Sequence, residues 1–462
     1  METPEVLLTP YACRLKEKIG DKTAVISVIG LGYVGLPLAV EIAKVGFKVV
    51  GLDHNPARSG KVNCGENYID DVKDDELLQL VQGGMISAYS SFAELPDVDI
   101  IVVCVPTPLT INREPNISYI ANVAREIALM LRPGNLVTLE STTYPGTTRD
   151  VLLPQLQESG LTVGEEFFLA YSPERIDPGN DHHNARNTSR VVGGITPACL
   201  EVARMFYSNT VNYKGPRRRR EDKLHPDVTP VSSPEVAELS KLYENTYRSV
   251  NIALVNELML LCDRMGIDVW QVIDAAGTKP FGIQIFYPGP GLGGHCIPID
   301  PFYLTWKARQ YDFHTRFIEL AGEINIEASY HVVRKLTRVL NNAGSCLKGA
   351  KIFILGVTYK KDIRDIRESP ALKIIDLILR EGAGIGYHDP YVPYLKPHEP
   401  YTWEFESHPL SVAGLQEADC VLILTGHSGI DYEWVAKHSK QILDTRNATR
   451  EVQNNREKII KI

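Results

Sequence analysis

A buried-strand pattern, followed by a glycine turn and a helical segment, occurs twice in this chain, once near each end. The first copy begins with the strand 24–29, and the second begins with the strand 350–355 before a helix at 370–380. In each copy a second apolar strand follows and ends in an acidic residue, Asp53 or Asp389. Because strands that alternate with helices form parallel sheets, we predict an α/β fold with two Rossmann-like, doubly wound parallel-sheet domains.

A long helical region separates the two copies. Ser233 and Pro234 are typical of an N-cap and a first helical residue, and apolar residues keep helical spacing up to Gly266, a C-terminal stop. A second helix is expected over 316–340. A chain of 462 residues is too long for one core. The predicted domains are a Rossmann-like domain at 1–230, a central helical domain at 231–345 and a second Rossmann-like domain at 346–462.

Charge, cysteine content and hydropathy exclude several classes of protein. The net charge of -8 argues against a general nucleic-acid binder. The eight cysteines are scattered without a Cys-x-x-Cys pair, which indicates reduced thiols and predicts a cytoplasmic protein. The N-terminus lacks the apolar region of a signal peptide. The longest apolar stretch, 25–40, holds three glycines and a proline and is too short to span a membrane.

Gly30, Gly32 and Gly35 form the pattern Gly-x-Gly-x-x-Gly between a strand and a helix. The first glycine permits a tight turn, the second lets a pyrophosphate approach the backbone, and the third allows close packing of helix on strand. Asp53 follows about 20 residues later, where an acid would bind a ribose and repel a 2′-phosphate. The pattern therefore predicts NAD rather than NADP, although Arg58 could also reach a phosphate. The alternative is a glycine turn without a ligand.

The second Rossmann-like segment has only Gly356 before Lys360 and lacks this loop. It could bind a nucleotide through Lys360 and Arg446, since lysine and arginine bind phosphates. Surface charges are the alternative for both residues. Arg217 to Arg220 lie in a polar, proline-containing loop, and the run is either a solvated loop or a phosphate contact.

Residues 289–294 include four glycines and lead into His295 and Cys296, with Asp300 four residues later. Glycines let backbone amides approach a ligand closely, and a thiolate is a good nucleophile. We therefore predict that Cys296 is a nucleophile, and a buried structural cysteine is the alternative.

Lys241 and Asn245 are four residues apart on the predicted long helix and therefore share one face. A lysine and an amide can together hold a developing alkoxide, while a solvated helix face is the alternative. Asp181, His182 and His183 stand together in the sequence but lack metal-ligand spacing. We predict no metal site.

From residue 24 to about 450 the chain resembles the UDP-glucose/GDP-mannose dehydrogenase family. Arg175 after a glutamate and His295 before the cysteine make it similar to the branch acting on UDP-N-acetylglucosamine. The departures are Pro280, where many members have an arginine, and Ile299, where a lysine is often found. The matching stretches are residues 30–37, 105–108, 140–143, 172–175, 238–242, 293–296 and 367–370.

This resemblance implies an N-terminal NAD domain, a helical middle and a C-terminal UDP-sugar domain, in at least a homodimer built on the central helix. It implies a four-electron oxidation of an alcohol at C6 to a carboxylate, with two NAD per sugar. Cys296 would form a thiohemiacetal and then a thioester. Lys241 with Asp300 would assist removal of the hydroxyl proton, Glu174 would activate water, and Thr142 and Asn245 would position water and stabilise the oxyanion.

The resemblance also implies contact residues for both ligands. For NAD they are Gly30, Leu31, Gly32, Tyr33, Val34, Gly35, Asp53, Arg58, Thr107, Thr142 and Arg367. For the UDP-sugar they are Glu174, Arg175, Ile176, Lys241, Asn245, Tyr287, Gly289, Gly291, Gly293, Lys360 and Arg446.

Three alternatives to a UDP-N-acetylhexosamine dehydrogenase stay open on sequence alone. A UDP-glucose 6-dehydrogenase would catalyse the same reaction on another hexose. A two-domain hydroxyacid dehydrogenase would oxidise once and need no thiol. A non-catalytic nucleotide-binding protein would bind the ligands without forming NADH.

Overall fold

The computed structural model groups the chain into two compact units by its internal contacts. Unit 1 comprises the residues up to 244 together with 302–311, and unit 2 comprises 245–301 and 312–462. The structure describes residues 8–69, 71–110, 112–175, 188–210, 219–220, 223–224, 228–294 and 296–462.

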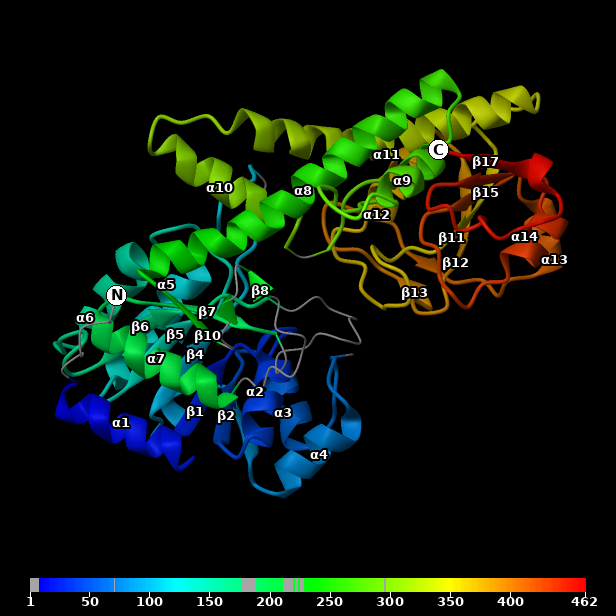
Figure 1. The fold of residues 1–462 in the computed structure, drawn as a ribbon. Helices are drawn as coiled ribbons and strands as arrows, with labels where there is room; N and C mark the ends of the chain where they lie inside the picture. Colours follow the sequence, from blue (N-terminus) through cyan, green and yellow to red (C-terminus); the bar gives the residue numbers. More distant parts are fainter. Residues whose placement is uncertain are drawn as a thin grey trace. The chain divides into compact units, whose positions relative to one another are not determined.

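Unit 1 is built on an eight-stranded sheet with the strand order β10-β7-β6-β5-β4-β1-β2-β3 (Figure 1). The strands from β1 to β6 pair in parallel, whereas β7 pairs antiparallel with β6, and β10 is parallel to β7. The bounds are β1 Val25–Ile29, β2 Lys48–Leu52, β3 Ile86–Tyr89, β4 Ile100–Val103, β5 Leu136–Leu139, β6 Phe168–Tyr171, β7 Arg190–Gly194 and β10 Val228–Val231, with a separate pair β8 Arg219–Arg220 and β9 Lys223–Leu224.

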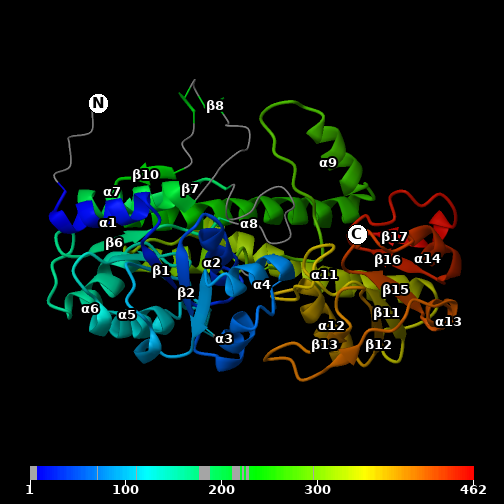
Figure 2. The same ribbon diagram turned by 90° about the horizontal axis from the view of Figure 1, so that it is seen from below.

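Helices cover both faces of this sheet, as the alternating side chains of its strands require. In β4, Ile100 and Val102 pack in a core that includes α1, α2 and α7, whereas Ile101 and Val103 pack in a core that includes α5 and α6 (Figure 2). The helices are α1 Pro10–Gly20, α2 Gly35–Lys44, α3 Pro56–Asn63, α4 Asp74–Gln82, η1 Phe92–Glu94, α5 Ser118–Met130, η2 Thr148–Leu152, α6 Leu153–Gln157 and α7 Pro197–Thr210.

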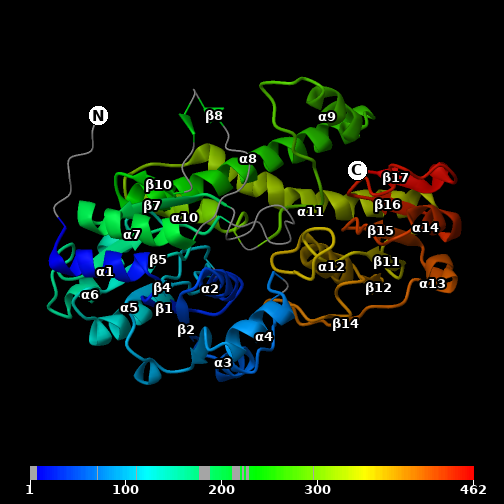
Figure 3. The same ribbon diagram turned by 60° about the horizontal axis from the view of Figure 1, so that its bottom comes forward.

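Unit 2 contains a five-stranded parallel sheet with the order β12-β11-β15-β16-β17 (Figure 3). In β11, Ile352 and Ile354 share a core with α11 and α12, whereas Phe353 and Leu355 share a core with α13 and α14. The strands are β11 Lys351–Leu355, β12 Gly384–His388, β15 Cys420–Ile423, β16 Ile442–Asp444 and β17 Ile459–Lys461, with the antiparallel pair β13 Tyr394–Leu395 and β14 Phe405–Glu406.

The helical elements of the central region and of unit 2 complete the chain. The long helix α8 begins in unit 1 and ends in unit 2, and α10 begins in unit 2 and continues in unit 1. The bounds are α8 Pro234–Met265, α9 Val269–Gly277, α10 Asp300–Arg309, α11 Arg316–Asn342, α12 Pro370–Arg380, α13 Val412–Glu417, α14 Tyr432–His438 and η3 Arg456–Lys458.

The predicted fold class is confirmed, since both sheets are parallel over most of their strands and have helices on both faces. The helix predicted at 370–380 is α12, and α8 ends at Met265 before Gly266, whose φ of +68° is the left-handed conformation that glycine favours. The reversal of β7 was not predicted. The division into three domains at 1–230, 231–345 and 346–462 stays a prediction. In the described part of the chain, no helix has the length and apolar character needed to span a membrane.

Candidate active site

The glycine loop of unit 1 connects β1 to α2 and has the shape that a dinucleotide requires. Gly30 has a φ of +93°, and a Cβ there would lie 2.5 Å from the carbonyl oxygen of Cys104. A Cβ on Gly35 would lie 1.8 Å from the carbonyl oxygen of Gly30, so only glycine fits either position. A Cβ on Gly32 would meet no atom within 4 Å, which leaves room for a phosphate beside the helix N-terminus. These residues fit NAD.

Asp53 follows β2 and is buried against the same loop. Its Oδ2 atom accepts a hydrogen bond from the amide of Leu31 at 3.0 Å and lies 3.3 Å from Nη1 of Arg58. The hydroxyl of Tyr68 donates to the carbonyl oxygen of Leu31 at 2.7 Å. Burial raises the pKa of Tyr68 to about 12, so this hydroxyl keeps its proton and its donor role at neutral pH. The acid predicted to bind the ribose therefore also holds the loop in place.

The strand order of unit 1 arranges the predicted residues along one edge of the sheet. Glu174, Thr142 and Thr107 come after β6, β5 and β4, and the glycine loop and Asp53 come after β1 and β2. Because parallel strands all end at the same edge, about 4.8 Å apart, these residues form a row. The order β3-β2-β1-β4-β5-β6 changes direction between β1 and β4, where dinucleotides bind in this topology.

Thr107 is held at this edge by a residue from far along the chain. The hydroxyl of Tyr303, which is fully buried in the unit 1 part of α10, donates to the carbonyl oxygen of Thr107 at 2.7 Å. Ser141, the neighbour of Thr142, donates to the carbonyl oxygen of Val105 at 2.8 Å. The two loops that carry the predicted threonines are thus anchored by side chains that were not predicted to contribute.

Glu174 belongs to a buried cluster of charged residues. Its Oε2 atom lies 3.1 Å from Nη2 of Arg190, and its Oε1 atom accepts the amide of Arg175 at 2.6 Å. Nη1 of Arg190 contacts Oε2 of Glu140 at 2.6 Å, and the hydroxyl of Tyr207 donates to Oε1 of Glu140 at 2.8 Å. The sequence analysis did not assign a role to Arg190 or Tyr207.

The side chain of Arg175, predicted to contact the sugar, is engaged within unit 1. Its guanidinium pairs with Glu244 on α8 at 2.7 Å and donates to the carbonyl oxygen of Ser189 at 3.0 Å. The predicted contact Ile176 lies outside the described residues, as do Asp181 to His183, Arg217 and His295. Among the residues that are described, no three of histidine, cysteine, aspartate and glutamate are placed to hold a metal ion.

The glycine-rich loop of unit 2 packs so closely on its surroundings that side chains are excluded from it. A Cβ on Gly289 would lie 2.6 Å from Nη1 of Arg446, and a Cβ on Gly293 would lie 2.5 Å from Cβ of Tyr359. Gly291 has a φ of +142° and would place a Cβ 2.9 Å from Oγ of Ser329. The structure therefore brings one of the predicted glycines of this loop, Gly289, together with Arg446.

Cys296 follows this loop and is partly exposed, so it is not a buried core cysteine. Its carbonyl oxygen accepts the amide of Asp300 at 2.8 Å where α10 begins. The amide nitrogen Nδ2 of Asn245 donates to Oδ2 of Asp300 at 2.5 Å, and both residues are buried. Hydrogen bonds of Asp300 thus connect the three predicted catalytic residues of unit 2, which are Cys296, Asp300 and Asn245.

Lys241 lies one helical turn before Asn245 on α8, so both side chains share a face of that helix. It is 7% exposed. Within the described ranges its ammonium makes no hydrogen bond or ion pair, although buried ammonium groups usually have a partner. This lysine is therefore available to a ligand.

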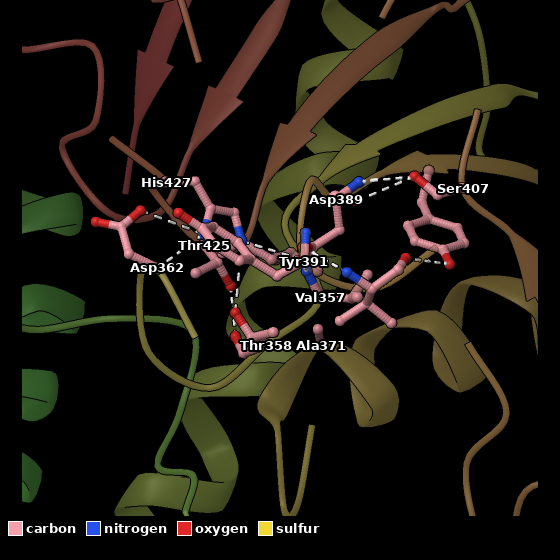
Figure 4. A network of polar contacts seen from close by, with 12 residues as sticks. Val357, Thr358, Asp362, Ala371, Asp389, Tyr391, Ser407, Thr425 and His427 are labelled. Carbon is pink, nitrogen blue, oxygen red and sulfur yellow. Dashed lines mark hydrogen bonds and ion pairs between the residues drawn. The ribbon is translucent and has the colours of Figure 1, made fainter. Parts of the chain in front are cut away.

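In the second sheet, the acid at the end of β12 is closed off by a histidine (Figure 4). Asp389 occupies the place that Asp53 has in unit 1: its Oδ2 atom accepts the amide of Val357 at 2.8 Å and lies 3.0 Å from Nε2 of His427. The amide of Asp362 donates to Nδ1 of His427 at 3.0 Å, so the ring proton is on Nε2 and faces Asp389. The acid of this sheet therefore pairs with a histidine, whereas Asp53 in unit 1 pairs with Arg58.

Arg446 and Lys360 lie at the same edge, after β16 and β11. Nε of Arg446 donates to the carbonyl oxygen of Leu424 at 3.0 Å, and among the described residues no carboxylate forms an ion pair with it. Burial lowers the pKa of Arg446 to about 10, which still leaves the group positively charged at neutral pH. A cation without a carboxylate partner favours binding of an anion.

Models of one protein family match most of the chain in three consecutive parts. They are described as the NAD binding domain, the central domain and the UDP binding domain of the UDP-glucose/GDP-mannose dehydrogenase family, and match residues 24–211, 235–327 and 353–451. A UDP-N-acetyl-D-mannosamine dehydrogenase of Methanococcus maripaludis is 32% identical over 437 residues, which are 91% of this chain and 92% of the relative. This chain belongs to the UDP-glucose/GDP-mannose dehydrogenase family.

Membership in this family makes the chain an NAD-dependent nucleotide-sugar dehydrogenase, as predicted, and not a hydroxyacid dehydrogenase or a non-catalytic binding protein. A UDP-N-acetyl-D-glucosamine 6-dehydrogenase of Pseudomonas aeruginosa is 33% identical over 404 residues, 87% of this chain and 90% of that protein. The solved structure of a UDP-D-ManNAc dehydrogenase from Pyrococcus horikoshii superposes with a TM-score of 0.82 at 30% identity, covering 95% of this chain and 98% of that one.

Several residues that hold the loop of this dehydrogenase before Cys296 were missed from the sequence. The buried side chain of Asn256 on α8 accepts the amide of Gly289 at 3.0 Å and donates to Oδ1 of Asn325 on α11 at 2.9 Å. The hydroxyl of Ser329 donates to the carbonyl oxygen of Pro290 at 2.7 Å. A polar residue on the core face of an otherwise apolar helix is the signal that could have identified these residues.

Glu238 on α8 ties this helix to the loop that follows Thr142 in the dehydrogenase. It is fully buried and accepts hydrogen bonds from the amide of Gly146 at 2.6 Å and from the amide and hydroxyl of Thr148 at 2.9 and 2.6 Å. Burial raises the pKa of its carboxyl to about 7, and the hydrogen bonds oppose part of that rise. The group therefore titrates near neutral pH.

We expect the Glu238→Gln variant to lose stability in a pH-dependent way. Because the folded pKa exceeds the ordinary value of 4.5, the contribution of Glu238 to the free energy of unfolding is full below that pH and is lost as the pH rises through about 7. The difference in pKa corresponds to about 3 kcal/mol. The variant also leaves a buried amide N–H without an acceptor, at a cost of about 1–3 kcal/mol. The unfolding free energy of both proteins is measured from pH 5 to 8.

The deficit of the Glu238→Gln variant relative to wild type should be largest at pH 5 and should shrink toward pH 8. Glu235→Gln is the control on the same helix, because the hydrogen bond from Arg149 keeps the pKa of Glu235 low despite its partial burial. A deficit that stays constant from pH 5 to 8 would show that Glu238 does not titrate in this range.

Proposed function

We propose that this enzyme oxidises a UDP-N-acetylhexosamine at C6 to the corresponding uronic acid, with Cys296 carrying the sugar between the two oxidations. The observation that carries the proposal is the glycine loop 289–294, which packs against Arg446 and ends at a partly exposed thiol. A partly exposed thiol that follows a glycine-rich loop supports a role toward a ligand more than a role in a core. One alcohol, two NAD⁺ and one water give one carboxylate, two NADH and three protons.

NAD, when bound, accepts a hydride in each of the two oxidations. For the first, we assign to Lys241 the stabilisation of the alkoxide that develops at C6, since its buried ammonium has no partner among the described residues. Asp300, which accepts a short hydrogen bond from Asn245, assists Lys241 by taking the hydroxyl proton through an ordered water, and Asn245 stabilises the oxyanion. Thr142, at the edge of the unit 1 sheet, positions water.

The second oxidation needs the sugar to stay bound as an aldehyde. The sulfur of Cys296 adds to the aldehyde carbon to give a thiohemiacetal, which loses a hydride to become a thioester. Glu174 then takes a proton from water, the oxygen bonds to the acyl carbon, and the C–S bond breaks with its electron pair on sulfur. The carboxylic acid so formed releases its proton to solvent. Glu174 then loses the proton it took from water, and the enzyme is back in its starting state.

The ligand contacts predicted from the sequence remain our assignment. For the UDP-sugar we assign the positive charges of Arg446 and Lys360 to the diphosphate, together with Arg175, Ile176, Tyr287 and the glycine loop. For NAD we assign the loop from Gly30 to Gly35, Asp53, Arg58, Thr107, Thr142 and Arg367. The guanidinium of Arg367 pairs with Asp365 at 2.6 Å in unit 2. A homodimer or higher oligomer and a cytoplasmic location stay predictions.

The most specific part of this proposal is the identity of the hexose. UDP-N-acetylglucosamine is our choice, because Arg175 follows Glu174 and His295 precedes Cys296 in this chain. The relatives include proteins named for UDP-N-acetylmannosamine as well as UDP-N-acetylglucosamine, which differ only in the configuration of the acetamido carbon. These names support an N-acetylated hexose more strongly than either epimer.

A panel of UDP-sugars at a fixed NAD concentration tests the proposal. We expect two NADH per sugar, and a kcat/KM for a UDP-N-acetylhexosamine at least about tenfold above that for UDP-glucose, since a specific amide contact discriminates by more than an apolar one. The panel contains UDP-N-acetylglucosamine, UDP-N-acetylmannosamine, UDP-N-acetylgalactosamine and UDP-glucose. Equal or faster turnover of UDP-glucose would make the enzyme a UDP-glucose 6-dehydrogenase instead.

A further inference from the structure

The cluster around Arg190 is the largest group of buried charges in contact with a residue of the proposed mechanism. Arg190 is 3% exposed and lies between two carboxylates, with Nη1 on Glu140 and Nη2 on Glu174. Both carboxylates are buried as well. A buried charge is costly unless it is paired, so each of these carboxylates depends on the guanidinium between them.

We propose that Arg190, oriented by Glu140, is a positioning residue that holds the carboxylate of Glu174 aimed at the water that hydrolyses the thioester. This inference rests on the proposed role of Glu174 and deepens it. Arg190 itself contacts neither water nor substrate in this scheme. It acts through Glu174.

The geometry of Glu174 leaves its carboxylate little freedom. Oε1 accepts the amide of Arg175 at 2.6 Å, and Oε2 lies 3.1 Å from Nη2 of Arg190, so both oxygens are held from different sides. Without the contact with Arg190, the carboxylate could rotate about χ3, because this torsion angle has a broad distribution in glutamate. A base must lie within hydrogen-bonding reach of the proton it removes, and small displacements lower the rate strongly.

Glu140 and Tyr207 hold the guanidinium in turn. Oε2 of Glu140 lies 2.6 Å from Nη1 of Arg190, and Oε1 of Glu140 accepts the hydroxyl of Tyr207 at 2.8 Å. The Tyr207 ring lies 5.4 Å from the guanidinium carbon of Arg190. An arginine can bridge two carboxylates with different nitrogens of its planar fork, whereas a lysine has one ammonium. The series of contacts that begins at Tyr207 and continues through Glu140 and Arg190 therefore ends at Glu174.

The titratable groups that face Arg190 come from four elements of unit 1. They are Glu140 after β5, Glu174 after β6, Tyr207 on α7 and, within electrostatic reach, the buried thiol of Cys104 after β4. Burial raises the pKa of Tyr207 and of Cys104, so both stay neutral at ordinary pH. The pKa of Arg190 is raised by the two carboxylates against the effect of burial, so it stays charged. Arg190 is the cation that balances the two acids.

The reversal of β7 explains why this cation stands beside Glu174. Arg190 is the first residue of β7, which pairs antiparallel with β6 through Tyr171 and Gly193. The amino end of an antiparallel strand lies at the edge where its parallel neighbours have their carboxyl ends. The reversal thus delivers an arginine to the row that carries Glu174.

The test uses the full-length enzyme with its UDP-sugar, and combines Arg190→Gln with Glu174→Gln in a double-mutant cycle. We expect Arg190→Gln to lower kcat at least about tenfold and to lower KM with it, so that kcat/KM changes by less than about threefold, because the slowed step follows formation of the acyl-enzyme. Intact-protein mass spectrometry should show the acyl group accumulating on Cys296.

In the Glu174→Gln background, Arg190→Gln should lower kcat by less than about threefold, because a residue that acts through Glu174 has nothing left to act on. An equal loss in both backgrounds would assign Arg190 a structural role and overturn the proposal. If Glu174→Gln itself kept the wild-type rate without an acyl adduct, the proposed role of Glu174 would fail instead. The two failures are therefore distinguishable.

Two milder variants keep the test decisive if Arg190→Gln does not fold. Arg190→Lys retains the charge but cannot reach both carboxylates, and should accumulate an intermediate amount of adduct. Tyr207→Phe removes only the hydroxyl on Glu140 and should have a smaller effect in the same direction. Arg204→Gln is the control, since this exposed arginine on α7 pairs with Glu201 and with no other acid among the described residues. Wild-type kcat and no adduct in Arg190→Lys would overturn the proposal.

Discussion

Replacing Cys296 with alanine should lower the rate of uronate formation by roughly 10³-fold or more, because the second oxidation then lacks its covalent carrier. The expected stoichiometry falls from two NADH per sugar to at most one. The aldehyde, no longer held on sulfur, should be released and trapped by a hydrazine in the assay. Mass spectrometry of the sugar products and NADH absorbance together measure both effects.

The matched control for this prediction is Cys346→Ser, since Cys346 is an exposed thiol in the same unit. It should turn over at the wild-type rate with two NADH per sugar. If Cys296→Ala still formed uronate at the wild-type rate, the covalent mechanism would be wrong, although family membership and NAD dependence would be unaffected.

Replacing Lys241 with methionine should lower the rate of the first oxidation by roughly 10²-fold or more, since the developing alkoxide loses its charge partner. Methionine has a similar length and suits a position that is 7% exposed, so the helix should remain intact. The rate is measured as NADH formation from the UDP-sugar alcohol.

The UDP-sugar 6-aldehyde, supplied as substrate, separates the two steps. The Lys241→Met variant should oxidise it at a rate within about tenfold of wild type, whereas Cys296→Ala should not oxidise it to the uronate. Lys348→Met, a change at an exposed lysine, is the control and should leave both rates unchanged. An equal loss with alcohol and aldehyde would contradict a role of Lys241 confined to the first step.

The elements with strong local patterns were predictable from the sequence. The segment 370–380 begins with proline after Ser369, whose hydroxyl accepts the amide of Ala371, and it forms the helix α12 with the predicted bounds. The glycine loop before α2 was predictable for the same reason, because a positive φ at Gly30 and close backbone contacts at Gly30 and Gly35 admit only glycine. Such features depend on residues that are neighbours along the chain.

Contacts between residues far apart in the sequence were harder to predict. Asp53 and Asp389 look equivalent in the sequence, since each ends the second strand of its sheet. The structure leaves Asp53 beside the glycine loop but pairs Asp389 with His427, a residue 38 positions further along the chain. A local pattern carries no information about which ring will reach a given carboxylate. The different roles of the two acids therefore emerged only from the fold.

The sequence by itself determined the two parallel sheets and the turn of the dinucleotide loop, because burial, helical spacing and left-handed turns are local properties. It also supplied the candidate residues for the chemistry, whose roles stay a prediction. The tertiary structure decided which of those residues gain partners. Arg190 stands beside Glu174 because β7 runs against its neighbour, and the direction of a strand follows from the pairing of residues far apart along the chain. That pairing minimises unpaired backbone and buried charge over the whole unit, which no short segment can specify.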